Sequence, residues 1–320
     1  MKARFLLRDC AFFFIPKIPL TALKRLKIYG DNDTIQSMKE RQTTKGVTSA
    51  KERAFYGAQN TDFINCRTEG EEDGESAFKE TENITLDGCS LSLRYPLWHC
   101  KNSTIMNSVM ADTCRAALWY DENLLIKNLD AKGIKALRES KKITIGKSSF
   151  LSDEFCWRCN DLNLHKVKVE SVYAFFQSEN AFIQYLDFKG KYSFQYVKNF
   201  FIRNSSLDTK DAFWHSEDVT CVNCDIKGEY LGWYSKNLTL IDCRISGTQP
   251  LCYAENLKLV NCTMEGCDLS FERSTVEAEV NGKIDSVKNA EGKIEADEIG
   301  SIIRDEYAKG DCEIIIRDKK

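Results

Sequence analysis

The feature that most constrains this sequence is a repeat of 19 residues, clearest between Asp218 and Cys262. Asp218 opens the segment DVTCVNCDIKGEYLGWYSK, Asn237 opens NLTLIDCRISGTQPLCYAE, and Asn256 opens NLKLVNC. A fixed period of this length is typical of solenoids, in which each repeat packs on its neighbours and none can bury its apolar face alone. The repeat therefore predicts one elongated domain, although a chain of 320 residues is long enough for two compact ones.

When each opening Asn or Asp is counted as position zero, the repeat extends over most of the chain. Its copies start at Asn60, Asn83, Asn102, Asn123, Lys142, Asp161, Asn180, Asn199, Asp218, Asn237 and Asn256. Positions one and three are apolar in most copies and position two is often Thr, which is the alternation of a short strand with one buried face. Position five is often Asn, a turn-forming residue, and positions six and eight are apolar again. Gly at position ten marks a second bend, at Gly133, Gly190, Gly228, Gly247 and Gly266.

These patterns together predict the fold class. A third short strand is expected at positions eleven to sixteen, so that each coil contributes three strands that pair in parallel with those of its neighbours. We predict an all-β, single-stranded, right-handed parallel β-helix of about 11 coils of 19 residues. Residues 52–275 form this β-helix, and residues 276–320 supply final short strands and a C-terminal cap. Residues 1–51 form a poorly ordered N-terminal extension.

The beginning of the chain is apolar and basic, in the manner of a secretory signal peptide. However, Arg8 and Asp9 interrupt the apolar run, Pro16 ends it, and no clear small-residue cleavage site follows. No stretch reaches the ~18 apolar residues that a membrane-spanning helix requires. We therefore expect a cytoplasmic protein without membrane association, and keep secretion as the alternative.

The charge balance, 45 basic against 48 acidic residues, gives a net charge of −3 and no field that would attract nucleic acid. Most of the 14 Cys fall at repeat positions. One position is shared by Cys66, Cys89, Cys224, Cys243 and Cys262. We predict that these residues are reduced and pack as small buried apolar groups. The pairs Cys156/Cys159 and Cys221/Cys224 lack zinc-type spacing, so we expect no metal and no cofactor.

Aromatic residues gather in the expected third strand. Position fifteen holds all the Trp residues of the chain, together with Phe176 and Phe271: Trp98, Trp119, Trp157, Trp214 and Trp233. Position sixteen is polar or aromatic, with His99, Tyr120, Glu139, Arg158, Gln177, Tyr196, His215, Tyr234 and Tyr253. Position fourteen is as apolar as position fifteen. Either one of these two columns is an exposed stripe, or the strand bends between them and buries both.

An exposed stripe of this length would bind a ligand, and aromatic residues beside hydroxyl, Arg and His groups suit a chain of sugars. Glu139 is the best placed general acid or base, and Arg138, Arg115 or Arg158 could hold a carboxylate or assist proton abstraction. Further candidates for catalysis are His99, Asp211 and His215. Further candidates for ligand binding are Tyr95, Trp98, Trp119, Tyr120, Tyr192, Tyr196, Lys210, Trp214, Glu229, Trp233 and Tyr234. The alternative role for the charged groups is a solvated ladder of ion pairs between coils.

Several phrases resemble a family of mostly bacterial proteins known as domain of unknown function 3737. They are RYPLWH (94–99), CRAALWY (114–120), GIKALRE (133–139), GKYSFQY (190–196), DTKDAFWH (208–215), KGEYLGWYS (227–235) and GTQPLCY (247–253). The resemblance covers about Glu52 to Ile303. It implies a right-handed β-helix of the pectate-lyase-like kind and brings no established activity with it.

Two functions are compatible with this sequence. The first is a β-helix that binds or processes an oligosaccharide or polysaccharide along the face of the third strand. The alternative is a non-catalytic structural or protein-interaction scaffold whose aromatic columns belong to the core. If the protein is an enzyme, it is a carbohydrate-active lyase or hydrolase. Nothing in the sequence indicates an oligomeric state.

Overall fold

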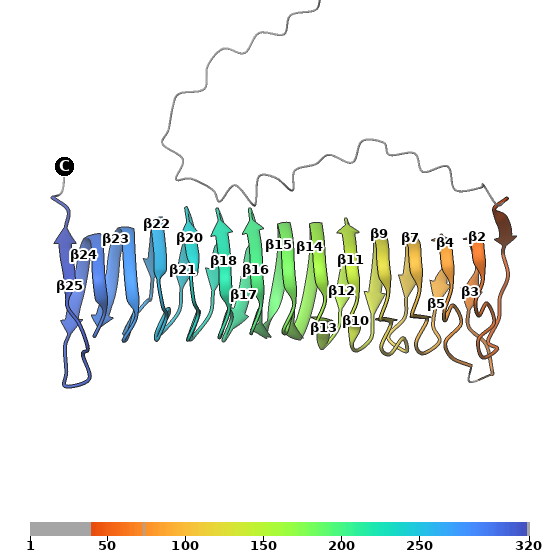
Figure 1. The fold of residues 1–320 in the computed structure, drawn as a ribbon, viewed down its shortest axis with the longest axis horizontal. Helices are drawn as coiled ribbons and strands as arrows, with labels where there is room; N and C mark the ends of the chain where they lie inside the picture. The colour runs from red at the N-terminus through yellow and green to blue at the C-terminus, as the bar shows by residue number, and fades with distance from the viewer. Residues whose placement is uncertain (1–39, 73, 319–320) are drawn as a thin grey trace, which may run out of the picture. The chain divides into compact units, whose positions relative to one another are not determined.

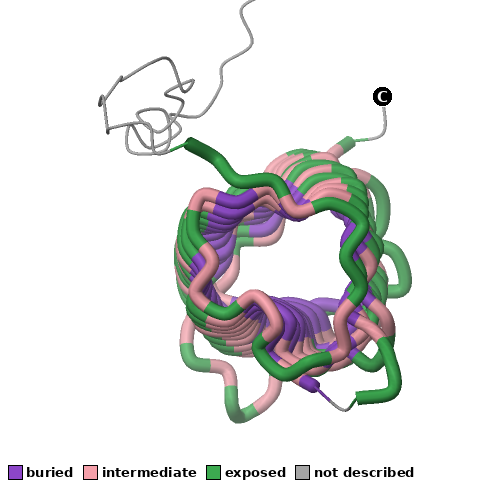
Figure 2. The backbone as a smooth tube through the Cα atoms, turned by 90° about the vertical axis from the view of Figure 1, so that its right-hand side faces the viewer, coloured by how far each residue is buried: buried purple, intermediate pink, exposed green. Residues whose placement is uncertain are grey.

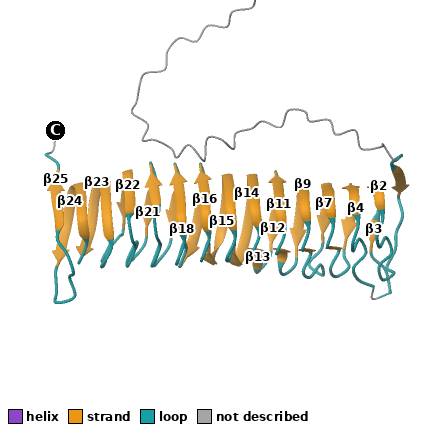
Figure 3. Ribbon diagram, viewed as in Figure 1, coloured by secondary structure: helices purple, strands orange, loops and turns teal. Residues whose placement is uncertain are grey.

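The computed structural model describes residues 40–72 and 74–318. The chain divides into two units, Met1–Glu40 and Arg41–Lys320, and all the described strands belong to the second. In this unit the strands form one parallel β-solenoid of about 14 turns, which is drawn in Figure 1. The described residues are all strands and connecting turns, as Figure 3 shows. The predicted disorder of the N-terminal extension concerns residues that lie, up to residue 39, outside the described part.

The first strand of each coil is the most regular element. These strands are β1 (Gln42–Lys45), β2 (Gln59–Ile64), β4 (Glu82–Asp87), β7 (Lys101–Met110), β9 (Glu122–Lys132), β11 (Lys141–Gly146), β14 (Asn160–Ala174), β15 (Glu179–Ser193), β16 (Lys198–Arg203), β18 (Glu217–Val222), β20 (Thr239–Ile241), β22 (Leu257–Glu265), β23 (Thr275–Lys288), β24 (Glu291–Ile303) and β25 (Cys312–Ile316). In β7, β9, β14, β15 and β22 to β24 the strand continues through the bend into the second side of the coil.

Separate second strands occur in the other coils: β3 (Arg67–Thr68), β5 (Ser90–Leu91), β12 (Ser149–Leu151), β17 (Ser206–Lys210), β19 (Asp225–Lys227) and β21 (Arg244–Ser246). The third side contains β6 (Leu97–Trp98), β8 (Leu118–Trp119), β10 (Ala136–Arg138) and β13 (Glu154–Trp157). The predicted third strand is therefore short in these coils, and in several later coils its place is taken by turns.

Parallel pairing places equivalent residues of successive coils side by side, as the sequence predicts. Ile143 of β11, for example, lies between Leu124 of β9 and Leu162 of β14. All the predicted starts have left-handed backbone, with φ between 49° for Asn60 and 58° for Asn123 and Asp161. Asn tolerates this conformation, and its amide also links coils: Asn123 Nδ2 donates to Asn102 Oδ1 at 2.8 Å. The predicted register of the starts is confirmed.

The core is a set of stacked columns inside the coil. Figure 2, which looks along the solenoid, shows buried positions recurring at the same places in successive coils. Position three contributes one such column: Phe63, Leu86, Ile105, Ile126, Ile145, Leu164, Ile183, Ile202, Cys221, Leu240 and Leu259. Position fourteen contributes another, in which the rings of Phe175 and Phe194 stack at 4.7 Å and those of Phe194 and Phe213 at 4.9 Å. Each buried Phe or Leu side chain contributes about 1.5–3 kcal/mol of transfer free energy.

The cysteines of the described residues are free, and all except Cys312 are buried. Burial raises the pKa of the Cys114 thiol and of the Cys267 thiol to about 12. The shared column has a second role, because the Cys243 thiol donates to the carbonyl oxygen of Ile241 at 3.2 Å, as Ser148 does to that of Gly146 at 2.9 Å. The prediction that these residues serve packing is confirmed.

A second buried polar column lies two residues before each start. Ser and Cys are frequent in it, and three of its members accept a backbone N–H group from the preceding coil. Cys159 N donates to Ser178 Oγ at 3.0 Å and Asp121 N to Ser140 Oγ at 3.1 Å. Within the part of the chain that the structure describes, Asp121 is the one carboxylate in this column, and its Oδ1 accepts a hydrogen bond from Cys100 N at 2.8 Å. Its Oδ2 is buried and has no hydrogen-bond partner among the described residues.

The solenoid extends beyond both predicted limits. Gln42 of β1 pairs with Thr61 of β2, so a coil begins inside the segment assigned to the N-terminal extension. At the other end β23, β24 and β25 pair in parallel with the coils before them, which continues the solenoid to Ile316. These added coils account for the difference between the predicted 11 and the observed count of about 14. No helix in the described residues is long and apolar enough to cross a membrane.

Candidate functional site

The surface around positions eleven, twelve, fifteen and sixteen, between Arg94 and Tyr253, is called the corner face below. Its shape depends on alternate left-handed residues. In the coil that starts at Asn199, Asp211, Phe213 and His215 have φ of 54°, 60° and 52°. Non-Gly residues seldom adopt this conformation, and its alternation replaces the pleat of a strand by a tight bend. As a result Ala212 and Phe213 both point inward with 0% exposure.

This bend decides between the two structures that the sequence allowed. Position fourteen is buried throughout, at 0–1% exposure for Leu97, Leu118, Leu137, Phe175, Phe194, Phe213 and Leu251. The Trp residues of position fifteen are half-buried, and position sixteen is mostly exposed. Neither apolar column is therefore a fully exposed stripe. Phe271 was assigned wrongly to position fifteen: Tyr253 N donates to Glu272 O, so one extra residue shifts Phe271 into the buried column.

The Trp column has a structural role. Each indole Nε1 but that of Trp98 donates to the carbonyl oxygen of position twelve in the next coil: Trp119 to Lys135 at 2.9 Å, Trp157 to Tyr173 at 2.9 Å, Trp214 to Tyr230 at 2.6 Å and Trp233 to Gln249 at 2.8 Å. Trp therefore suits this position for two reasons: its indole N–H donates a hydrogen bond, and its ring buries a large apolar area. Trp98 Nε1 is buried without a partner within the described part of the chain.

We expect Trp119→Phe to lower the free energy of unfolding by about 1–2 kcal/mol, because it leaves the Lys135 carbonyl without its indole donor. Trp98→Phe is the matched control, since it removes an indole that has no acceptor, and it should cost less than Trp119→Phe. Urea unfolding of the two variants beside the parent measures both values. Equal losses of unfolding free energy in the two variants would show that the Trp residues stabilise the protein through ring area alone.

The exposed rings at position sixteen stack on one another along the axis. His99 and Tyr120 lie 4.8 Å apart at 8°. A second run joins Tyr196, His215, Tyr234 and Tyr253, with centroids 4.9 Å, 5.0 Å and 5.0 Å apart. The ring faces within each run are therefore covered by neighbouring rings. Hydroxyl groups, imidazole nitrogens and ring edges are what this row presents to solvent.

The charged candidates are paired between coils. Arg158 donates from Nε to Gln177 Oε1 at 3.0 Å and lies 3.5 Å from Glu139 Oε1. Arg138 is turned away from Glu139: its guanidinium lies between the rings of Trp119 and Trp157, at 5.0 Å and 4.6 Å, and pairs with Glu154. Glu139 and Arg158 are neighbours in this row, as the sequence predicts. Arg138 instead occupies position fifteen between Trp119 and Trp157.

The remaining candidates form smaller groups. Lys210 pairs with Glu229 at 2.9 Å, which raises the pKa of Lys210. Asp211 is 7% exposed, and desolvation raises the pKa of its carboxyl group. The ring of Tyr95 packs on Trp98 at 5.5 Å and that of Tyr192 on Tyr173 at 5.3 Å. Arg115 is exposed on position eleven.

These groups contain no cluster of three or more His, Cys, Asp or Glu that could hold a metal ion, over the residues the structure describes. The corner face offers a row of hydrogen-bonding groups, in which Glu139 is paired with Arg158 and Lys210 with Glu229, while the Tyr hydroxyl and His ring nitrogen groups face solvent. Such an arrangement can bind a polar ligand.

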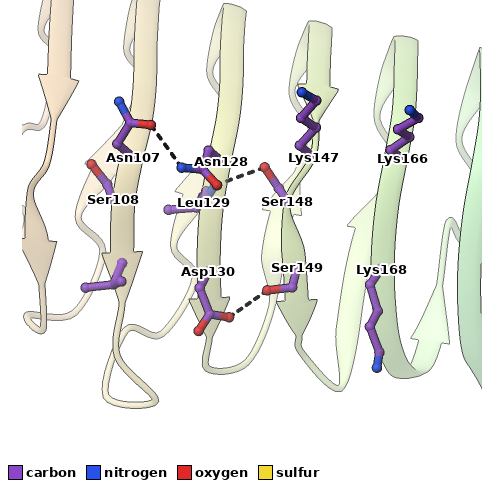
Figure 4. Close-up of a pocket in the computed structure, with 11 residues that line it drawn as sticks. Asn107, Ser108, Asn128, Leu129, Asp130, Lys147, Ser148, Ser149, Lys166 and Lys168 are labelled. Atoms are coloured by element: carbon purple, nitrogen blue, oxygen red, sulfur yellow. Dashed lines mark hydrogen bonds between the residues drawn. The ribbon is translucent and has the colours of Figure 1, made fainter.

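Sequence reasoning missed a shallow groove on another side of the coil, which we call the bend groove. It follows the turn at positions five to seven as two separate hollows, of 460 Å³ and 660 Å³, with the coil that starts at Asn180 between them. The first is lined by Asn107, Asn128, Lys147, Lys166 and Lys168 among others (Figure 4), and the second runs from Asn204 to Asn281. A signal was present in the sequence, because Lys147, Lys166 and Tyr185 interrupt the Asn residues of position five.

The solved structures to which the chain is similar include two bacterial proteins, both at low similarity. One is the surface protein and adhesin PfbA of Streptococcus pneumoniae, with 10% identity, coverage of 86% of this chain and 90% of that one, and a TM-score of 0.36. The other is the A-module of the mannuronan C-5 epimerase AlgE4 of Azotobacter vinelandii, with 10% identity, 86% and 89% coverage, and a TM-score of 0.35. At these values neither carries an argument about function. No curated protein matches the chain. The sequence does match, over residues 42–317, the family described as a protein of unknown function (DUF3737), and the chain belongs to this family.

Proposed function

We propose that this protein binds an oligosaccharide or polysaccharide along the corner face, without processing it. The observation that carries the proposal is the row at position sixteen, which places one polar or aromatic side chain per coil in a straight line from His99 to Tyr253. Adjacent coils of a parallel sheet lie about 4.8 Å apart. A ligand with a regular chain of hydroxyl groups can therefore meet the same kind of contact repeatedly.

The mode of contact follows from the stacking of the rings. Because Tyr196, His215, Tyr234 and Tyr253 cover one another's faces, a sugar meets ring edges and the outward hydroxyl and imidazole groups. Tyr is well suited to this role, since its rigid ring loses little conformational entropy on binding. Stacking on the neighbours restricts these rings further before any ligand arrives.

Processing of the ligand is less favoured than binding. Glu139, the best candidate acid or base, is ion-paired with Arg158, and Arg138 is held between two indole rings and bonded to Glu154. General acid and base catalysis requires a group within hydrogen-bond reach of the substrate proton and free to exchange it. Glu139→Gln is accordingly expected to leave glycan binding nearly unchanged.

Screening the intact protein on a glycan array, followed by titration of the glycans that bind, tests the proposal. Tyr234→Ala opens a gap in the row and is expected to weaken binding at least tenfold. Tyr307→Ala is the matched control, because the Tyr307 side chain is also exposed, at 57% against 47% for Tyr234, and lies between β24 and β25, outside the corner face. An array without any bound glycan, or an equal loss in both variants, would contradict the proposal and favour the scaffold, in which the stacked rings serve stability alone.

A further inference from the structure

The middle of the bend groove breaks the pattern of the column that forms it. In most other coils position five carries Asn, whose amides bond from coil to coil: Asn128 Nδ2 donates to Asn107 Oδ1 at 2.9 Å and Asn223 Nδ2 to Asn204 Oδ1 at 2.8 Å. The exceptions are Gly88 and Asp242, and Asp242 accepts the amide of Asn261. Asn suits this position because the backbone there is left-handed. Three successive coils instead carry Lys147, Lys166 and Tyr185, with φ of 50°, 56° and 55°.

These three residues adopt a strained backbone conformation without the amide ladder that compensates it in the other coils. Lys and Tyr are not enriched in left-handed conformations, whereas Asn is. A position that departs from its local rule without a structural gain is where function is expected. Lys147 and Lys166 line the stretch of the groove that Figure 4 shows, and Tyr185 belongs to the coil that follows it.

The same stretch concentrates positive charge. Figure 4 shows Lys147 and Lys166 extending in the same direction from adjacent coils, with Lys168 on the other side of the bend. None of the three forms an ion pair within 4.0 Å with any described residue. Other lysines of the surface do: Lys142 pairs with Glu122, and Lys198 with Glu217, both at 2.9 Å.

Two carboxylates beside these lysines, Asp130 and Asp187, form no ion pair with them within 4.0 Å in the described part of the chain. Asp130 accepts a hydrogen bond from Ser149 Oγ at 2.7 Å, and Asp187 stands opposite Lys168 in the pairing of β14 with β15 without forming an ion pair. Lys166 Nζ is 5.9 Å from the centroid of the Tyr185 ring, a distance at which a cation is attracted to the ring. Adjacent like charges repel each other, so an anion between them would be stabilised.

We propose that this stretch of the bend groove is a binding site for an oxyanion, a carboxylate, sulfate or phosphate group carried by a ligand that lies along the groove. Lys147 and Lys166 bind the group as a pair, Lys168 adds charge from the facing side, and Tyr185 closes the row. The site is on a different side of the coil from the corner face. It therefore stands on its own observations and not on the proposed function.

The experiment measures saturable binding at constant ionic strength, because screening by added salt would otherwise imitate or hide the effect. Sodium phosphate, sodium sulfate, glucuronate and a uronic-acid oligosaccharide serve as probes in thermal-shift and calorimetric titrations. We expect at least one probe to bind. The double variant Lys147→Asn with Lys166→Asn should weaken that binding at least tenfold, and because Asn is the usual residue of the column, its melting temperature should not fall.

Lys142→Asn is the matched control. Lys142 is also a lysine with left-handed backbone in an Asn column of the same coil, with φ of 55°, but it is paired with Glu122. It should leave the affinity for the probe unchanged. Binding of phosphate or sulfate alone would assign the site to an inorganic or phosphorylated ligand, and binding of the uronates would assign it to an acidic saccharide; both support the site.

Three results would overturn the proposal. They are the absence of saturable binding by every probe, binding that is unchanged in the folded double variant, and an equal loss in Lys142→Asn. Tyr234→Ala separates this site from the corner face, because it should leave oxyanion binding intact, while the double variant should leave binding at the corner face intact.

Discussion

Gly247→Ala is expected to lower the free energy of unfolding by about 3 kcal/mol or more. Gly247 has φ of 127°, a conformation that other residues scarcely adopt. A Cβ atom there would overlap the carbonyl oxygen of Gly228 in the preceding coil and lie 2.6 Å from its carbonyl carbon. The two backbones cannot separate without breaking the pairing of β19 with β21.

Gly266→Ala provides the control for this variant. Gly266 occupies the same position ten and also has left-handed backbone, with φ of 62°, but nothing lies within 4 Å of an added Cβ. Only the conformational cost applies, and we expect about 1 kcal/mol. The midpoints of urea unfolding of both variants measure the difference. A loss at Gly247 no larger than that at Gly266 would show that the coils can move apart at this bend.

Asp121 is expected to make the stability of the protein fall as the pH rises between about 4 and 7. Complete burial, opposed in part by hydrogen bonds from Cys100, raises the pKa of its carboxyl group from 3.8 to about 7. The folded protein therefore keeps a proton that the unfolded chain has lost. This contribution to stability is fully present below pH 3.8 and disappears as the pH passes 7, with a slope of at most about 1.4 kcal/mol per pH unit.

Asp121→Ser should remove this dependence, because Ser140 and Ser178 show that a hydroxyl group satisfies the same column. At pH 8 the variant is expected to be more stable than the parent by up to about 4 kcal/mol, and near pH 4 the advantage should vanish. The quantity to compare is the difference in unfolding free energy between the two proteins at each pH, since other carboxylates titrate in both. Asp121→Asn, which cannot ionise, is the second test. A difference that stays constant from pH 4 to 8 would contradict the assignment.

The parts of this fold that could be predicted are those in which the residue type indicates the backbone conformation. Asn at positions zero and five favours the left-handed turn, so the starts and the period were correct from the sequence. The first coil was missed because Arg41 stands where Asn would be expected. The segment after Thr275 was predicted as final short strands and a cap and not as further regular coils, because it carries no Asn at its starts and its spacing changes.

The sequence predicts where the corner face lies but not its backbone geometry. Its left-handed residues include Phe213, His215 and Tyr234, and such side chains give no sign of that conformation. A prediction based on the alternation of a flat strand could not place positions fourteen and fifteen. The hydrogen bonds of the indole groups depend on contacts between coils, as does the pairing of Arg138 with Glu154, and neither follows from the order of residues within one repeat.

The buried free cysteines make the local opening of the solenoid measurable by thiol labelling. A thiol reacts as an exposed thiolate, so a buried cysteine becomes reactive when its coil separates from its neighbours. Cys66 and Cys89 lie near the beginning of the solenoid, Cys156 and Cys159 near its middle, and Cys262 and Cys267 toward its end. Because each repeat of a solenoid contacts only its neighbours, these sites divide the rod into segments that can loosen one after another. The rate at which each of these core cysteines reacts therefore reports the order in which the coils of the solenoid separate.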